Sequence, residues 1–464
     1  MRITGTQKVT IVGGGPCGSV LALYLLKLGV EVDVYELREE EDEEEEDKLK
    51  SSTKRSINLA LSYRGLCALE HVGAKELVMR EAVEMHSRMV HQEDGEVAKQ
   101  RYGTKDGESI FAVSRPRVVK LLSNLAQKRG ARYHFGEKFV GFDDERRPTF
   151  ASGKVGETPT FGCDGAFSAT RKAMERLGRY DFHLWYAKQG YKELSIPCSS
   201  LAAKEYVFPQ NFLHIWPRGD TMLIALPNVD ASFTATLFGP CETLEHMEAH
   251  WSREKVQEYF QSTFPDAFEK MPDAVDEFFR NPTSPLVQLK VSPWHHQDKV
   301  LIIGDASHAV VPYYGQGMNA ALEDCLALAE IISEHTSFND DHNDNNPQKI
   351  DFKSVFLAVS DTRRKAADGL SILATRNYED MAKNTASKTY RARKALERLV
   401  ATYFPSLWLP QYSMVTFSRM PYDQVLRRES IQENALTTLC ATVTLAALAS
   451  LASILAYSLR FSAK

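Results

Sequence analysis

The chain has 464 residues, of which 43% are hydrophobic and 25% are charged, and its formal net charge is −5 at pH 7. This composition is that of a globular protein with a large core and enough length for two or three domains. The nine consecutive acidic residues from Glu39 to Asp47 supply more than the whole net negative charge. The charge balance therefore gives no reason to expect a nucleic-acid partner.

The cysteines and the amino terminus indicate a reducing compartment. Seven cysteines are scattered along the chain, with no CxxC pair and no Cys/His spacing of a metal site. We therefore expect reduced thiols and no bound metal. The first eight residues contain no apolar signal core, so the sequence does not predict secretion.

Residues 9–36 predict a strand, a tight turn, a helix and a second strand. The apolar run Val9 to Val12 leads into three glycines, a helical pattern covers residues 16–28, and a β-branched run from Val30 to Val34 follows. This order is typical of the first βαβ unit of a dinucleotide-binding domain.

The spacing Gly13-x-Gly15-x-x-Gly18 in this turn is that of a dinucleotide site. One glycine turns the chain, one lets a pyrophosphate approach the backbone, and one lets the helix pack on the strand. The free N–H groups at the start of the helix then face the phosphates. Glu36, at the end of the second strand, is placed to accept hydrogen bonds from ribose hydroxyls. A glycine turn in another kind of α/β unit is the alternative.

The acidic run that follows is expected to stay solvated. Like charges at this density repel one another, which predicts a disordered loop over residues 39–54. An acidic patch that binds a partner is the alternative.

Three later segments carry further site candidates. Arg115 lies near the start of a helix predicted to end at about residue 129, where a cation gains nothing from the helix dipole; an anionic or carbonyl partner is expected, with a plain surface arginine as the alternative. The turn Asp164-Gly165, followed by Ser168 and Arg171, closes a strand and opens a helix, so its aspartate could order a loop near a cofactor.

The third segment is the apolar strand Val300 to Ile303, which ends in Gly304-Asp305. This is the carboxyl edge, where doubly wound sheets bind their ligands. Gly315 and Gly317 then precede an amphipathic helix and would present backbone N–H groups there. His308 is expected to be structural rather than catalytic, because the sequence names no partner acid for it.

Residues 206–238 and the carboxyl-terminal part of the chain complete the predicted architecture. Repeated strand patterns in 206–238 predict a second, antiparallel sheet inserted in the first domain. Residues 350–420 are mostly helical in pattern. Residues 435–459 contain no charge, and as a helix they would reach about 37 Å at about 1.5 Å per residue, enough to cross a bilayer core of about 30 Å. A membrane anchor is favoured over a buried or oligomer-forming helix.

The glycine spacing, the Asp-Gly turn and the Gly-Asp strand end, in this order, resemble the three signatures of single-component flavoprotein aromatic hydroxylases. Four further segments closely resemble the members of this family that hydroxylate kynurenine. They are RSINLALS (55–62), LHIWPR (213–218), VPYYGQGMNA (311–320) and YSMVTFSR (412–419). It implies an α/β fold: a Rossmann-like FAD-binding domain (1–180 and 291–345), an inserted sheet domain for the substrate (181–290), a helical region (346–430) and a membrane helix (435–459).

The resemblance also implies the ligands. The residues implied to bind FAD are Gly13, Gly15, Cys17, Gly18, Tyr35, Glu36, Leu37, Arg38, Ala60, Arg115, Phe139, Asp164, Asp305, Gly317, Met318 and Asn319. Those implied to bind L-kynurenine are Arg88, Tyr102, Asn377 and Tyr412. Arginine would grip the substrate carboxylate, and tyrosine offers an apolar ring with a polar tip.

The implied reaction is hydroxylation of kynurenine to 3-hydroxykynurenine, with NADPH and O2 as co-substrates and a flavin C4a-hydroperoxide as the oxygen donor. No side-chain acid or base is expected to be essential, because the cofactor carries the chemistry. The expected location is the mitochondrial outer membrane, facing the cytosol. The alternatives are a related flavin monooxygenase acting on a quinone or sterol-type lipid, and a non-catalytic flavin-binding adaptor that recruits partners through the acidic run.

Overall fold

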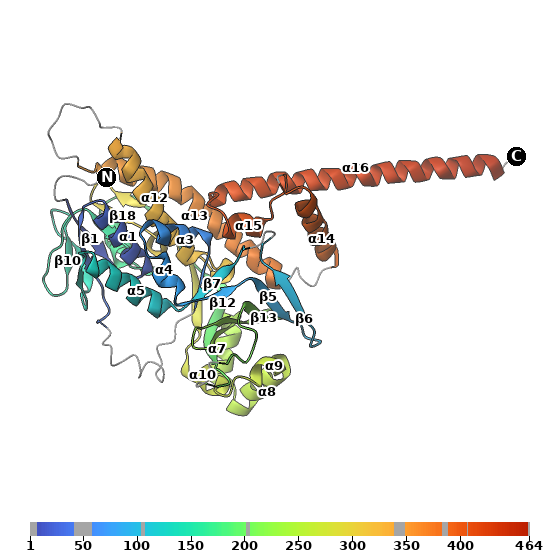
Figure 1. The fold of residues 1–464 in the computed structure, drawn as a ribbon, viewed down its shortest axis with the longest axis horizontal. Helices are drawn as coiled ribbons and strands as arrows, with labels where there is room; N and C mark the ends of the chain where they lie inside the picture. Colours follow the sequence, from blue (N-terminus) through green and yellow to red (C-terminus); the bar gives the residue numbers. More distant parts are fainter. Residues whose placement is uncertain are drawn as a thin grey trace.

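The structure is a computed structural model, in which a two-sheet body carries one long helix that projects to the carboxyl terminus (Figure 1). It describes residues 7–40, 58–103, 107–200, 205–337, 349–382, 388–405 and 407–462. The predicted disordered loop lies almost wholly outside these residues, since only Glu39 and Glu40 of it are described.

The first sheet is the doubly wound sheet that the glycine spacing predicts. Its strand order is β17-β18-β11-β1-β2-β8, and every pair is parallel except that of β17 with β18. The four inner strands, β18, β11, β1 and β2, are almost wholly buried, as expected of a parallel sheet covered on both faces, whereas the short edge strands β8 and β17 are polar and partly exposed. They comprise β1 (Lys8–Val12), β2 (Glu31–Tyr35), β8 (Arg132–His134), β11 (Thr160–Gly162), β17 (His295–His296) and β18 (Val300–Ile302).

Helices pack around this sheet and form the main core. Helix α1 is buried from Gly18 to Leu25 because it lies between the sheet and two other helices, α5 and α12. Apolar side chains from the strands and these helices make one continuous cluster. Each fully buried leucine or isoleucine in it contributes about 1.5–3 kcal/mol. The helices are α1 (Pro16–Lys27), α3 (Tyr63–His71), α4 (Lys75–Met79), α5 (Arg115–Lys128), α6 (Ala169–Met174), α11 (Asp305–His308), α12 (Gly317–Ser337) and α13 (Phe352–Ala382).

The second sheet has the order β16-β12-β15-β14-β13-β5-β6. The strands of the insertion pair antiparallel, as expected, and β5, which lies outside the insertion, pairs in parallel with β13. Strands β5 and β6 come from the part of the chain that precedes the insertion. The second sheet therefore combines strands of the insertion with strands from before it. The strands are β5 (Ser87–His91), β6 (Val97–Arg101), β12 (Asp181–Ile196), β13 (Phe212–Arg218), β14 (Thr221–Pro227), β15 (Phe233–Pro240) and β16 (Ser284–Ser292).

Four short helices cover the part of this sheet that lies farthest from the first domain (Figure 1). They bury an apolar cluster that includes Trp216, Phe233 and Phe260. These helices are α7 (Cys241–His250), α8 (Arg253–Thr263), α9 (Pro265–Phe268) and α10 (Ala274–Arg280).

Small elements connect the two sheets. Strands β3 (Leu59–Leu61), β7 (Ile110–Val113) and β4 (Ala82–Met85) form a three-stranded sheet, and β9 (Phe139–Phe142) pairs with β10 (Pro148–Phe150). Strand β4 leads directly into β5, so the small sheet joins the first domain to the second sheet. The short helix η1 (Pro312–Tyr314) precedes α12.

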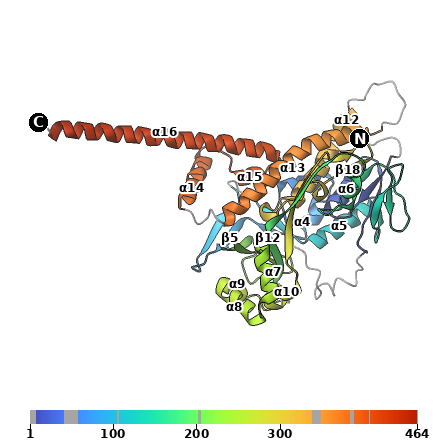
Figure 2. The same cartoon turned by 180° about the vertical axis from the view of Figure 1, so that it is seen from behind.

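The carboxyl-terminal helices are α13, α14 (Lys388–Tyr403), α15 (Gln411–Thr416) and α16 (Tyr422–Ser462). Helix α16 begins against α13, where Gly369 leaves room for the backbone of Asp423: a Cβ at Gly369 would lie 2.6 Å from that nitrogen. It then leaves the body, as both views show (Figures 1 and 2). Its segment from Tyr422 to Ile454 is long and apolar enough to cross a membrane.

Candidate active site

The glycine turn has the backbone geometry that its spacing predicts. Gly13 has φ +103°, and a Cβ there would lie 2.6 Å from the carbonyl oxygen of Cys163. A Cβ on Gly18 would lie 2.0 Å from the oxygen of Gly13. Only glycine fits these two positions. A Cβ on Gly15 would meet no atom within 4 Å, so this side of the turn is open to a ligand. The turn thus fits a pyrophosphate.

Glu36 has a role that the sequence did not show. Its carboxylate accepts hydrogen bonds from the backbone N–H groups of Gly14, at 2.6 Å, and Arg38, at 3.0 Å. It therefore holds the glycine turn against the end of β2. Binding of a ribose by Glu36 stays a prediction.

The neighbours of Glu36 divide between core and surface. Tyr35 is stacked between the rings of His134 and Phe150, with centroids at 4.4 and 3.8 Å. Phe139 is buried in the same aromatic cluster. Leu37 and Arg38 are exposed beside the turn. The buried side chains support the backbone here, and the exposed ones are available to a cofactor.

Asp164 orders its turn, as the sequence predicted. Its carboxylate accepts hydrogen bonds from the hydroxyl of Ser168 and from the backbone N–H and hydroxyl of Thr170. The buried guanidinium of Arg171 then donates to the carbonyl oxygens of Ala166, at 2.8 Å, and Ala306, at 2.9 Å. This bridge fixes the Asp-Gly turn to the segment that begins at Asp305.

Asp305 lies exposed at the carboxyl end of β18, at the same edge as the glycine turn. Gly304 before it has φ +65°, and a Cβ at Gly304 would lie 3.1 Å from the sulfur of Cys17. Arg115 is exposed at the first residue of α5. The topology therefore gathers the predicted cofactor residues at one edge, although they come from distant parts of the chain.

Asn319 connects the start of α12 to strand β3. Its side-chain amide donates to the carbonyl oxygens of Ala60, at 2.7 Å, and Gly315, at 2.9 Å, and its oxygen accepts from the N–H of Ser62 at 2.8 Å. The side chain is fully buried, while Gly317 and Met318 beside it are half-buried. The first backbone N–H groups of α12 are thereby held beside β3, which suits a site for a flavin ring.

Arg88 lies beside a stacked pair of tyrosine rings on the predicted substrate side. Its Cζ is 5.3 Å from the ring centre of Tyr102 and 4.8 Å from that of Tyr412, and the two rings stack at 5.4 Å. The Nε of Arg88 and the hydroxyl of Tyr102 are buried, and neither has a hydrogen-bond partner among the described residues. A buried polar group without a partner costs about 1–3 kcal/mol, so this pair is arranged for a ligand.

The electrostatics of this group favour an anion. Burial raises the pKa of Tyr102, so its hydroxyl is neutral and can donate a hydrogen bond. Burial acts to lower the pKa of Arg88, but its interactions with Tyr412, which include a hydrogen bond, and with Tyr102 act in the opposite direction, and that pKa lies above its ordinary value. A fixed positive charge beside a neutral donor fits a carboxylate.

Asn377 supports the site indirectly, through the backbone of Tyr313. Its amide donates to the carbonyl oxygen of Tyr313 at 2.8 Å, and Tyr313 packs on Tyr378 with ring centres 4.4 Å apart. The next residue, Tyr314, stacks on Tyr412 at 5.8 Å. Asn377 thus fixes the loop between β18 and α12 that carries these rings.

One apolar cluster joins the two halves of the site. Met85, Tyr102, Ile110, Ala112 and Leu226 form it, and Ala60, on the cofactor side, and Tyr412, on the substrate side, pack against it. The residues predicted to touch flavin and those predicted to touch substrate therefore share one wall.

The sequence missed the acids around His308. Its Nε2 lies 2.5 Å from a carboxylate oxygen of Asp324, about two turns into α12, and Arg363 Nε is 2.7 Å from the other oxygen. The ring of His308 is buried, bound to Asp324 and stacked on Trp294, which is consistent with the structural role that the sequence predicts. The partner acid could not be named from sequence, since Asp324 reads as one of several charges on an amphipathic helix.

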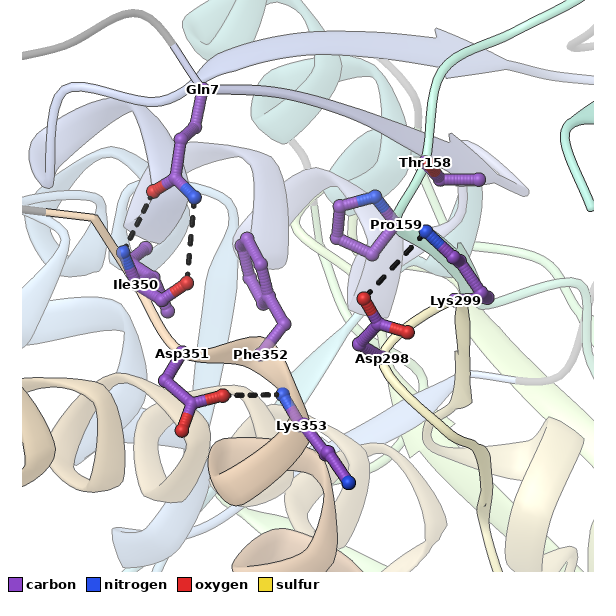
Figure 3. Close-up of a pocket in the computed structure, with 9 residues that line it drawn as sticks. All are labelled: Gln7, Thr158, Pro159, Asp298, Lys299, Ile350, Asp351, Phe352 and Lys353. Carbon is purple, nitrogen blue, oxygen red and sulfur yellow. Dashed lines mark hydrogen bonds and ion pairs between the residues drawn. The ribbon is translucent and has the colours of Figure 1, made fainter.

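A surface pocket lies at the opposite edge of the first sheet (Figure 3). Gln7, Pro159 and Lys299, which line it, each directly precede a strand, namely β1, β11 and β18. These are the amino ends of parallel strands, whereas ligands of such sheets bind at the carboxyl ends.

In the part of the chain that the structure describes, no group of histidine, cysteine or acidic side chains could hold a metal ion.

A family model described as an FAD-binding domain matches residues 6–339. Curated kynurenine 3-monooxygenases are similar over almost the whole chain: that of Flavobacterium johnsoniae is 39% identical over 432 residues, which cover 90% of each chain. The chain belongs to the kynurenine 3-monooxygenase family. It is an FAD-dependent monooxygenase.

Other members of the kynurenine 3-monooxygenase family match equally widely. The enzyme of Dictyostelium discoideum is 38% identical, covering 91% of this chain and 90% of its own. That of Caenorhabditis elegans is 35% identical and covers 95% and 96%.

Solved structures confirm the aromatic hydroxylase fold. The tetrameric form of 2-methyl-3-hydroxypyridine-5-carboxylic acid oxygenase has a TM-score of 0.62 at 19% identity and covers 83% of this chain and 95% of its own. The p-nitrophenol 4-monooxygenase of Pseudomonas putida has a TM-score of 0.63 at 18% identity and covers 87% and 96%.

Proposed function

We propose that this enzyme hydroxylates L-kynurenine to 3-hydroxykynurenine, with NADPH and O2 as co-substrates. The observation that carries the proposal is the half-buried Arg88 beside the stacked rings of Tyr102 and Tyr412, where the buried Nε of Arg88 and the hydroxyl of Tyr102 have no partner among the described residues. The names of the family members supply the substrate class, and the site supplies a place for its carboxylate.

Arg88 and Tyr102 would bind the amino-acid end of the substrate. A guanidinium can donate two parallel hydrogen bonds to a carboxylate, and a neutral phenol adds a third. The apolar cluster behind Tyr102, which includes Met85 and Leu226, would receive the aromatic ring. The substrate is thereby oriented with its charged end fixed and its ring toward Ala60.

The chain fits FAD at three places: the open side of Gly15, the strand end at Asp305, and the start of α12 held by Asn319. When bound, FAD would supply the redox chemistry, accepting a hydride from NADPH and activating O2 for transfer of one oxygen atom to the ring. The backbone N–H groups at the start of α12 would stabilise negative charge on the reduced flavin.

The protein's own contribution is binding, orientation and exclusion of water. No side chain is proposed as an essential acid or base, because the ring carbon next to the amino group is already electron-rich. The ring of Tyr412 stacks on those of Tyr102 and Tyr314, and the three rings keep this side of the site apolar.

We also propose that α16 anchors the enzyme in the mitochondrial outer membrane, with the body in the cytosol. Leu445, Leu448, Leu451 and Ile454 each expose more than half of their surface. An unpaired apolar helix of this length is stabilised by a bilayer. Fractionation of cells that produce the full chain tests the location.

The test of the reaction uses the detergent-solubilised full chain loaded with FAD. NADPH oxidation is measured with no substrate, with L-kynurenine, and with 2-aminoacetophenone, which has the same aromatic ketone but no carboxylate. We expect stimulation by kynurenine alone and 3-hydroxykynurenine as the product by mass spectrometry. Stimulation by a quinone or sterol precursor but not by kynurenine would contradict the proposal.

A further inference from the structure

Three cysteines from distant parts of the sequence meet beneath the glycine turn. Cys17 is the second residue of α1, Cys163 follows β11, and Cys325 lies in α12. The sulfurs of Cys17 and Cys325 are 3.7 Å apart, and the Cys325 sulfur is also 3.5 Å from the carbonyl oxygen of Cys17. Cys163 contacts Cys17 as well. The redox chemistry and the substrate site do not use the thiols of this cluster, although the resemblance implies that Cys17 contacts FAD.

The three thiols differ in exposure and in acidity. Cys17 is half-buried, whereas Cys163 and Cys325 are buried. Hydrogen bonds from Cys163 and Cys325 lower the pKa of Cys17 to about 6. Burial and the contact with Cys17 raise the pKa of Cys325 well above its ordinary value. At neutral pH the sulfur of Cys17, the half-buried residue of the three, is thus the nucleophilic thiolate, and its neighbour is a thiol.

We propose that Cys17 and Cys325 are a peroxide-sensitive dithiol site, which closes to a disulfide between α1 and α12 when FAD is absent and is protected when FAD is bound. Three observations carry this inference: the 3.7 Å sulfur separation, the half-buried position of Cys17 beside two buried cysteines, and the place of Cys17 inside the phosphate-binding turn.

The reaction consumes one hydrogen peroxide and two thiols. The Cys17 thiolate attacks one peroxide oxygen, the O–O bond breaks, and hydroxide leaves, which gives a sulfenic acid on Cys17. The Cys325 sulfur then attacks the Cys17 sulfur, the S–O bond breaks and the second oxygen leaves as water. Both sulfurs are oxidised, the peroxide is reduced to two waters, and the thiol protons end in those waters.

The disulfide would change the cofactor site. Its sulfurs must approach from 3.7 Å to about 2.05 Å, which draws α12 toward α1. Helix α1 begins at the glycine turn, and α12 carries Asn319, which holds β3. Oxidation would therefore deform two contacts that FAD needs, and we expect oxidised protein to bind FAD at least tenfold more weakly.

The test compares the full chain with and without FAD. Both samples are treated with hydrogen peroxide, free thiols are blocked with iodoacetamide, and the digest is analysed by mass spectrometry. We expect a peptide pair joined through Cys17 and Cys325, at least tenfold more abundant in the FAD-free sample and lost after dithiothreitol. This readout needs no kynurenine turnover, so it is independent of the proposed reaction.

Two variants sharpen the result. In Cys325→Ser the cross-link should be absent, and dimedone should trap a sulfenic acid on Cys17. In Cys241→Ser, a change at a half-buried cysteine in α7, the cross-link should form as in the parent. The flavin absorbance of each variant loaded with FAD shows that it is folded. Three outcomes would each overturn the proposal. The first is a cross-link from Cys17 to Cys163, and the second is equal oxidation with and without FAD. The third is that the parent protein forms no cross-link at a peroxide dose that oxidises Cys241.

Discussion

The guanidinium of Arg64 in α3 donates two hydrogen bonds to the carboxylate of Glu323 in α12, at 2.9 and 3.0 Å, and both side chains are buried. Arg64 also donates to the carbonyl oxygen of Val415, at 3.0 Å, and Arg363 in α13 binds the same carboxylate at 3.0 Å. This pair therefore fixes the carboxyl-terminal segment that carries Tyr412 to the helix that carries Asn319.

Replacing Glu323 by Ala should destabilise the enzyme strongly. It leaves the buried Arg64 and Arg363 without one of their carboxylates, which costs about 3–5 kcal/mol. Thermal unfolding of the full chain measures this, with Lys270→Ala as the control because its pair with Glu269 is on the surface and contributes about 0–1 kcal/mol. Equal loss in the two variants would contradict the role of Glu323.

Replacing Arg88 by Ala should raise KM for kynurenine by about 100-fold, since a charge-assisted pair contributes about 3 kcal/mol. FAD content should not change, because Arg88 lies in β5 of the second sheet, whereas the glycine turn follows β1 of the first sheet. Arg88→Lys should recover part of the loss. If the purified Arg88→Ala variant lost its flavin in proportion, Arg88 would belong to the cofactor site instead.

Replacing Asp305 by Ala should release FAD from folded protein, because Asp305 lies exposed at the carboxyl edge of the first sheet, beside the glycine turn. Asp298→Ala is the matched control at the opposite edge of that sheet, next to the surface pocket. Flavin absorbance after gel filtration gives the occupancy. The assignment of the cofactor edge fails if the two variants retain flavin equally.

His214 should make the protein less stable in acid. Burial, together with nearby His91, lowers its pKa to about 4, so the folded protein keeps it neutral. In the unfolded chain the pKa is about 6.5. Between these values the unfolded state binds the extra proton, and stability present above pH 6.5 falls by up to about 3 kcal/mol as the pH drops toward 4.

The measurement is the thermal unfolding midpoint at pH 7, 6 and 5. His214→Gln should flatten this pH dependence, whereas His183→Gln, at an exposed position of β12, should leave it unchanged. Parallel curves for His214→Gln and the parent would show that another group sets the acid limit.

Charges in α16 should weaken membrane attachment. Arginine near the centre of a spanning helix costs about 2.5–3.5 kcal/mol, so the double change Leu445→Arg and Leu448→Arg should shift the protein toward the soluble fraction. Leu357→Arg, at an exposed leucine of α13, is the control. Membrane flotation measures the distribution, and unchanged flotation of the double variant would rule out anchoring by α16.

The sequence alone determined the local elements and the class of the fold. Glycine is required at position 18 by a close contact with the backbone of Gly13, and at position 13 by a close contact with the backbone at the end of β11. The spacing of these glycines therefore identifies the turn directly. The apolar period predicted α1 and α5, and the uncharged run predicted the far half of α16. These signals depend on residues close together in the chain.

Only the tertiary structure decided which distant groups meet. It paired β5 in parallel with β13, which places Arg88 beside Tyr412, and it gave His308 its partner Asp324. It also turned the carboxylate of Glu36 onto the glycine turn and brought three scattered cysteines together. Such contacts follow from how helices and sheets pack around a common core, and the packing depends on the whole set of buried side chains rather than on any one segment.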